Sequence, residues 1–184
     1  KWIAGYSDIT VLHAHLNSLG VATIHSTMPI SFPDATELAL ENLRRALFGE
    51  LTEFASVEES DVAEVSGCVM GGNLSVLYSL LGSHSWRKTT DVILFIEDVG
   101  EQLYNIDRML YQYKRSGKLA SLAGLIVGGF TECKDTERPF GKTAHEIINE
   151  IVSEYNYPVS FDFPVSHTER NYALKVGAIY ELRV

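Results

Sequence analysis

The sequence predicts an α/β protein, and three features of the chain indicate this class. Residues 92–96 and 122–130 are mainly apolar runs, typical of strands that are buried on both faces. Residues 103–113 and 144–155 instead carry apolar side chains at helical spacing. Residues 1–49 read as strand, helix, strand, helix, the alternation of an α/β layer. We therefore expect strands and helices packed in layers.

Composition restricts the class of function. The 184 residues include 15 Lys and Arg against 24 Asp and Glu, a formal net charge of −9. Such a surface repels phosphate backbones, so no nucleic-acid partner is expected. The longest apolar stretch, 122–130, is much shorter than the roughly 20 residues of a membrane span, so no membrane partner is expected either. Two cysteines, Cys68 and Cys133, form no disulfide framework, which favours a reducing, cytoplasmic location.

The first 49 residues are interpreted as the remainder of an N-terminal α/β domain. The chain opens on what reads as the end of a strand, so we expect further polypeptide before Lys1. Ser7 or Asp8 is expected to cap a helix that runs to about Leu19. A second helix is expected to open at Pro33-Asp34 and to end at Gly49. The apolar stripe of the first helix comprises Ile9, Leu12, Leu16 and Leu19.

The pattern changes after Gly49, and residues 50–184 are expected to form a second domain. Residues 51–70 read as short strands, and Gly71-Gly72-Asn73 as a turn before a short helix. Near the end of the sequence, 159–163 reads as a strand. Residues 174–184 read as a closing strand with an interruption at Gly177.

Glu97 is the most informative carboxylate of the sequence. It follows the apolar run 92–96 and so stands at the end of a strand expected to be buried on both faces. Ligands and catalytic groups collect at strand ends in α/β structures. A capping or surface role is the alternative, because Glu97 and Asp98 also precede a helix, and position alone favours this alternative.

His167 lies in the loop expected after the strand 159–163. Imidazole titrates near pH 6.5, so a loop histidine can act as a general base, although an exposed histidine without a catalytic role is the simpler interpretation. Together, Glu97 and His167 suit the last two members of a Ser…Glu…His triad. The carboxylate would then hold the imidazole, and the imidazole would take the proton of the serine.

The serine of such a triad is not fixed by the pattern. Ser7 stands between a strand and a helix, but a nucleophile elbow has glycine two residues after its serine, and this chain has Ile9. Helix capping is therefore the favoured role of Ser7. Ser75 and Ser79 lie in a predicted helix and are expected to pack or to face solvent.

The other histidines show no cofactor pattern. His13 and His15 are two residues apart on a helix and point to different faces, so they cannot share a metal. His25 ends a strand, where it could line a pocket, and His84 and His145 are expected at the surface. No zinc-ligand spacing, dinucleotide fingerprint or phosphate loop is present, so we expect no metal and no cofactor.

Several stretches, taken together, resemble the serine LD-carboxypeptidases, also called muramoyltetrapeptide carboxypeptidases, which include the microcin C immunity peptidases. They occur in the order of the family over nearly the whole chain. The matching stretches are Gly5-Tyr6-Ser7-Asp8-Ile9-Thr10, Gly71-Gly72-Asn73-Leu74, Leu94 to Glu101, Ile106 to Leu110, Gly128 to Cys133, and Pro164-Val165-Ser166-His167 with Val176-Gly177 behind.

The resemblance implies a fold, a reaction and two site residues. The fold would be an N-terminal flavodoxin- or amidotransferase-like α/β domain followed by a β-rich, swivelling-type C-terminal domain. Glu97 and His167 would be the triad acid and base, and the nucleophilic serine would lie in a glycine-rich turn before Lys1. The reaction would release the terminal D-alanine of murein tetrapeptides during cell-wall recycling, in a cytoplasmic homodimer. Arg170 is a weaker candidate to hold the terminal carboxylate of the substrate.

Two departures and two alternatives accompany the resemblance. The family often has glycine where this chain has Ser166, and Gly-Pro-Met where this chain has Ser26-Thr27-Met28. These changes affect the expected loop and the pocket wall. The alternatives are an immunity-type peptidase that cleaves a toxic aminoacyl-nucleotide analogue, and a non-catalytic binding module with the same fold.

Overall fold

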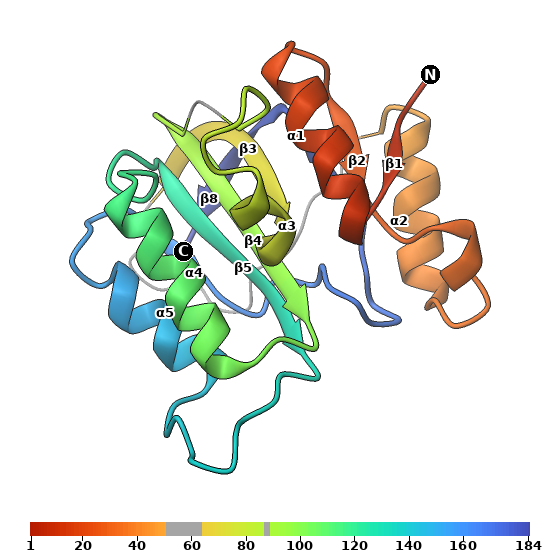
Figure 1. The fold of residues 1–184 in the computed structure, drawn as a ribbon. Helices are drawn as coiled ribbons and strands as arrows, with labels where there is room; N and C mark the ends of the chain where they lie inside the picture. Colours follow the sequence, from red (N-terminus) through yellow and green to blue (C-terminus); the bar gives the residue numbers. More distant parts are fainter. Residues whose placement is uncertain (51–63, 87–88) are drawn as a thin grey trace.

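A computed structural model describes residues 1–50, 64–86 and 89–184 (Figure 1). Its larger sheet has five strands in the order β6-β5-β4-β3-β8. The strands β3, β4, β5 and β6 run parallel to one another, and β8 at the edge is antiparallel to β3. Their bounds are β3 Glu64–Asn73, β4 Val92–Val99, β5 Gly124–Thr131, β6 Val159–Ser160 and β8 Ala178–Arg183. The predicted α/β class is confirmed.

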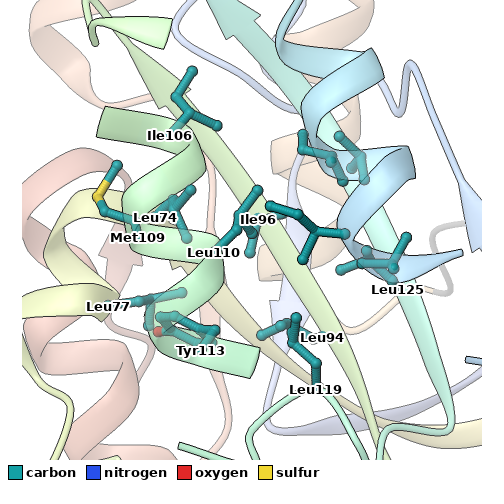
Figure 2. Close-up of a cluster of buried hydrophobic side chains, with 14 of the residues drawn as sticks. Leu74, Leu77, Leu94, Ile96, Ile106, Met109, Leu110, Tyr113, Leu119 and Leu125 are labelled. Carbon is teal, nitrogen blue, oxygen red and sulfur yellow. The ribbon is translucent and has the colours of Figure 1, made fainter. Parts of the chain in front are cut away.

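Helices cover one face of this sheet, as Figure 1 shows for α4 (Leu103–Arg115) and α5 (Ala144–Val152). The helix α3 (Leu74–Ser79) follows β3 directly. Between helices and strands lies the core of the molecule, and the side chains drawn in Figure 2 belong to it. Its fully buried members include Leu74, Leu77, Leu94, Ile96, Ile106, Leu110, Tyr113, Val127 and Ile148. These helices and strands agree with the apolar periodicities of the sequence.

A second apolar cluster lies on the opposite face of the sheet, because side chains alternate between faces along a strand. Its strand residues are Val69, Ile93, Phe95 and Ile126, and residues after β6 cover them: Val165, Leu174 and Val176. Strand β4 is therefore buried on both faces from Val92 to Asp98. This confirms the interpretation of the run 92–96.

A smaller sheet has the order β1-β2-β7. Strands β1 (Ala4–Gly5) and β2 (Thr23–His25) are parallel, and β7 (Leu174–Val176) is antiparallel to β2. The helices α1 (Thr10–Ser18) and α2 (Glu37–Leu47) lie beside it in Figure 1. Two single-turn 3-10 helices, η1 (Ser7–Ile9) and η2 (Pro29–Ser31), complete this part. The domain boundary at residue 49 remains a prediction. In the structure, β7 (residues 174–176) pairs with β2, so a segment from the expected second domain completes the sheet of the first region.

The interruption predicted at Gly177 separates two strands of two different sheets. Gly177 has φ +83° and its N–H donates to the carbonyl of Val69 at 2.7 Å. Strand β7 before it pairs with β2, and β8 after it pairs with β3. A left-handed backbone, which glycine adopts at little cost, is what lets the chain change sheets here.

Two local expectations for the first region are wrong. Leu12 and Leu19 are 47% and 65% exposed, and Ile9 and Leu16 are only partly buried, so the predicted apolar stripe is not the buried face of α1. The buried residues of that helix are Thr10, His13 and Ala14, and two of them make buried hydrogen bonds that a hydrophobic pattern does not register. Helix α2 begins after Thr36, whose hydroxyl accepts from Ala39 N–H, and not at Pro33-Asp34.

Two further expectations concern the middle of the chain. Gly71-Gly72-Asn73 continues β3 and pairs with β4, so it is not a turn. A Cβ on Gly71 would lie 1.9 Å from the carbonyl oxygen of Phe95, which explains why glycine is required for this close pairing. Of the predicted short strands in 51–70, residues 51–63 lie outside the described part of the chain.

Candidate active site

Glu97 lies within β4, where the strand is irregular. Ile96 pairs with Val127, but Asp98 pairs with Phe130, so the register shifts across Glu97. Its side chain is completely buried. A carboxylate in such a place requires polar partners, because a buried charge without them is strongly unfavourable. The alternative of a surface position for Glu97 is therefore wrong.

The glycine pair of β5 lets the His167 loop approach this carboxylate. A Cβ on Gly128 would lie 2.3 Å from the carbonyl oxygen of Val165 and 3.1 Å from Cβ of Glu97. A Cβ on Gly129 would lie 2.5 Å from Cβ of Ser166, and the Gly129 N–H donates to the carbonyl of Val165 at 3.1 Å. The missing side chains thus make room for the loop that carries the histidine. Ser166 has an ordinary backbone conformation, as its side chain requires.

His167 meets Glu97 directly. Its Nδ1 lies 2.7 Å from Oε2 of Glu97, within the range of a charge-assisted hydrogen bond. The side chain of His167 is 14% exposed, and its ring lies edge-on to the ring of Tyr6, with centroids 4.7 Å apart. The other nitrogen, Nε2, is buried and has no hydrogen-bond partner among the described residues. The hydrogen bond at Nδ1 therefore fixes the orientation of the imidazole, while Nε2 makes no hydrogen bond to the described residues.

The two groups shift each other's proton affinity. Burial alone would raise the pKa of Glu97, but the hydrogen bond from His167 and the nearby rings of His167 and His25 outweigh it, and the pKa is lowered. Burial alone would lower the pKa of His167, but the hydrogen bond and charge of Glu97 outweigh it, and the pKa is raised. Both directions stabilise an ionised carboxylate next to an imidazole that readily takes a proton.

Ser7 occupies a strained turn between β1 and α1. Its φ is +60°, a left-handed conformation that is unfavourable for a residue other than glycine. Its side chain caps neither η1 nor α1, and neither does that of Asp8, so the expected capping role is wrong. The side chain of Ile9 packs where a Cβ on Gly5 would lie, 2.9 Å away, so the glycine two residues before the serine accommodates Ile9.

Buried polar groups of neighbouring segments hold the turn that carries Ser7 in place. The carbonyl of Gly5 accepts from Ser26 N–H at 3.1 Å and lies 2.9 Å from Nε2 of His13. Burial lowers the pKa of His13 to about 4, against the opposing effect of the Gly5 hydrogen bond, so this ring is neutral at pH 7 and donates from Nε2. Thr10 accepts from Asn73 N–H at 3.1 Å. The turn is therefore fixed to β2, α1 and β3.

A second carboxylate lies beside Glu97 and has a structural role. Asp98 accepts from Asn73 Nδ2 at 2.8 Å, from Ser75 N–H at 2.9 Å and from Val99 N–H at 2.9 Å. Burial nonetheless raises the pKa of Asp98 to about 6. Ser75 Oγ donates to Oδ1 of Asn73, so Ser75 packs in this network as expected.

His25, expected from the sequence only as a residue that could line a pocket, lies beside the catalytic candidates. It ends β2, is completely buried, and places Nε2 3.7 Å from Oε1 of Glu97. The only available signal was its position at a strand end, the same signal that drew attention to Glu97.

The remaining candidates lie away from this group or at the surface. His15, His84 and Arg170 are exposed, and so is Ser79. His145 is partly exposed and lies 3.7 Å from Asp162. In the described ranges no group of three or more His, Cys, Asp or Glu side chains could hold a metal ion. No described helix is long and apolar enough to cross a membrane.

The arrangement has a recognisable chemistry. A carboxylate fixes one nitrogen of an imidazole, the other nitrogen is unengaged, and a serine lies on a strained turn beside the ring that contacts the imidazole. These are the parts that serine hydrolases use for acyl transfer.

The chain belongs to the LD-carboxypeptidase family. Residues 66–182 match the family's LD-carboxypeptidase C-terminal domain. The Bacillus subtilis protein named "Probable murein peptide carboxypeptidase" is 35% identical over 184 residues, which cover 95% of this chain and 57% of that protein. The murein tetrapeptide carboxypeptidase of Pseudomonas aeruginosa is 27% identical and is covered to 60%. The chain thus spans less than two thirds of the length of these relatives.

Solved structures agree with this assignment. The muramoyltetrapeptide carboxypeptidase of Oxalobacter formigenes superposes on the whole chain with a TM-score of 0.90 at 28% identity, and 65% of its length is covered. The microcin C7 self-immunity protein MccF in complex with glutamyl sulfamoyl guanosine superposes with a TM-score of 0.82 at 23% identity. The second likeness shows the fold alone.

Proposed function

We propose that the protein containing this chain is a serine carboxypeptidase that hydrolyses the L,D-peptide bond before the terminal D-alanine of murein tetrapeptides. The hydrogen bond between His167 and Glu97 is the observation that carries the proposal. The names of the relatives from Bacillus subtilis and Pseudomonas aeruginosa support the substrate class. The role would be cell-wall recycling in the cytoplasm, and we expect a homodimer.

The roles follow from the geometry. Nε2 of His167 takes the proton of the nucleophilic serine as its oxygen attacks the carbonyl carbon, while Glu97 stabilises the imidazolium. The same nitrogen then gives the proton to the leaving amine of D-alanine, and water hydrolyses the acyl-enzyme in a second step. Serine, histidine and carboxylate suffice for this reaction, so the proposal includes neither a metal nor a cofactor.

We propose Ser7 as the nucleophile, in place of a serine before Lys1. Three observations support Ser7: its strained backbone between strand and helix, the contact of the adjacent Tyr6 with the ring of His167, and the absence of the capping bond that was expected of it. An upstream serine remains the alternative, and labelling separates the two.

A fluorophosphonate probe, which reacts with activated serines, tests the assignment on the full-length protein. We expect Ser7→Ala to abolish labelling and turnover, and Ser79→Ala, which alters an exposed serine on α3, to preserve both. Mass spectrometry of the labelled peptide identifies the reacting serine. Labelling of a residue before Lys1 in the Ser7→Ala protein would overturn the choice of Ser7.

Two other functions are distinguished by substrate. The relatives include the Escherichia coli microcin C7 self-immunity protein, 28% identical over 62% of this chain, so an aminoacyl sulfamoyl nucleoside is the second substrate to assay. Release of D-alanine from a murein tetrapeptide, measured by mass spectrometry, supports the first function. If neither substrate is cleaved and no serine is labelled, the protein is a non-catalytic binding module.

A further inference from the structure

The buried carboxylate of Glu97 has two oxygens, and the triad accounts for one of them. Oε2 accepts from His167, whereas Oε1 has no hydrogen-bond partner within 3.5 Å among the described residues. A fully buried carboxylate normally accepts several hydrogen bonds, since each lost bond to water must be replaced. The second oxygen therefore requires a donor.

His25 is placed to be that donor. Its Nε2 lies 3.7 Å from Oε1 of Glu97, and both side chains are completely inaccessible to solvent. Neither ring nitrogen of His25 has a hydrogen-bond partner among the described residues. A movement of about half an ångström would bring this pair within hydrogen-bond distance.

The ring of His25 is held in place by aromatic neighbours from three elements. It lies edge-on to Phe95 of β4, with centroids 5.1 Å apart, and faces Tyr6 at 6.4 Å and His13 of α1 at 6.1 Å. His13 uses its Nε2 for the carbonyl of Gly5, so it does not compete for Glu97 through that nitrogen. The titratable groups around the Glu97–His167 pair are thus His25, His13, Tyr6 and Asp98.

We propose that His25 is a positioning residue of the active site, which donates from Nε2 to Oε1 of Glu97 and so holds the catalytic carboxylate between two histidines. The inference rests on the proposed function. His167 on one side moves the proton, and His25 on the other fixes the carboxylate. This fixes the rotamer of Glu97 and, through it, the plane of the His167 ring.

The proposal has a consequence for proton affinity that a purely structural role lacks. A donor to Oε1 stabilises the ionised carboxylate and so makes the Glu97–His167 pair less basic. Removal of this donor makes the pair bind its proton more tightly. The acid limb of the pH profile of kcat/KM then moves to higher pH, because turnover requires His167 without that proton.

The experiment compares His25→Leu with His25→Gln in the full-length protein. His25→Leu introduces an apolar side chain of similar size and removes the donor. We expect it to lower kcat by about 10- to 100-fold, with little change in KM, because one hydrogen bond to a charged group is lost. We expect His25→Gln, whose amide can donate from a similar position, to recover most of the turnover.

The resting protein provides a readout that needs no substrate. NMR of protein labelled with ¹⁵N-histidine follows the titration of the His167 ring, assigned by its loss in His167→Gln. We expect the midpoint of His167 to move upward in His25→Leu and to return toward the native value in His25→Gln. Because the ring itself is observed, the titration of Asp98 near pH 6 does not obscure the result.

Ile24→Ala is the matched control for stability. Ile24 is the completely buried neighbour of His25 on β2, and it packs with Leu43, Ala46 and Ala173 on the other face of the strand. We expect Ile24→Ala to lower the melting temperature without changing the titration midpoint of His167. If His25→Leu melts like Ile24→Ala and leaves kcat and the His167 midpoint unchanged, the proposal is overturned.

The proposed function can fail separately. If Glu97→Gln and His167→Ala retain turnover, the triad is wrong, whatever His25 does. If both are inactive while His25→Leu retains native kcat and pH dependence, only the inference about His25 fails. The inference about His25 would also be overturned if His25→Gln lost as much turnover as His25→Leu and the titration midpoint of His167 moved upward in neither variant.

Discussion

Two buried regions of this molecule are held together by different forces. Below α4 and α5 lies an apolar core of Leu, Ile, Val, Met, Trp and Tyr side chains. Residues of α1, β2, β3 and β4 form a buried polar layer, which consists of Thr10, His13, His25, Asn73, Glu97 and Asp98. Apolar contacts need only shape, whereas each polar group needs a partner at a fixed distance. We therefore expect substitutions in the apolar core to lower stability alone, and substitutions in the polar layer to lower catalytic turnover.

The largest effect is expected in the polar layer. Glu97→Gln keeps the size of the side chain but removes the charge that holds His167. We expect turnover to fall by about 10⁴-fold, the magnitude seen when the triad carboxylate of a serine protease is replaced by its amide. Steady-state kinetics and circular dichroism on the same sample give the answer. Unchanged kcat in a correctly folded Glu97→Gln protein would contradict the proposed triad.

The apolar core should respond in the opposite way. Leu110 of α4 is 1% exposed and packs in the core under the helices. We expect Leu110→Ala to lower the free energy of unfolding by about 2–5 kcal/mol, through lost burial and the cavity left behind. Urea unfolding measures this change. The kcat of the folded fraction should stay within a few-fold of native, and a loss comparable to that of Glu97→Gln would show that the two regions are not separate.

The smallest expected effect is a shift in the pH dependence of kcat/KM. Because Glu97 raises the pKa of His167, protonated His167 persists to higher pH than a free imidazole of pKa about 6.5. We expect kcat/KM to fall as pH decreases through a midpoint above that value. The raised pKa also means that the bond stabilises the fold most at low pH, and this contribution is lost as pH rises through the folded-state pKa. A profile that is flat down to pH 5 would exclude a histidine base.

The same contrast explains what the sequence could predict. Strand β4 and helices α4 and α5 were predicted because apolar periodicity reports burial directly, and long regular elements carry many repeats of it. Helix α1 was misread because its buried face holds Thr10 and His13, whose hydrogen bonds join it to distant backbone. Hydrophobic patterns carry no information on such bonds.

The site was predicted in part for related reasons. Glu97 and His167 were found because strand ends and a family pattern point to them. Their 2.7 Å contact also depends on Gly128 and Gly129, whose role emerges only once the His167 loop lies against them. The positive φ of Ser7 and the approach of His25 to Glu97 depend on the packing of three separate elements. Neither follows from local sequence.

The glycine at position 177 has a consequence for how the protein is made. Val176, just before it, accepts from the side chain of Asn17, a contact that spans 159 positions. Contacts of such separation form late in folding and reduce its rate, because the long intervening loop must first be closed. A nascent chain that has emerged from the ribosome only as far as β6 would carry β2 with one edge unpaired. The pairing of β2 with β7 therefore forms only after residues 174–176 have been synthesised.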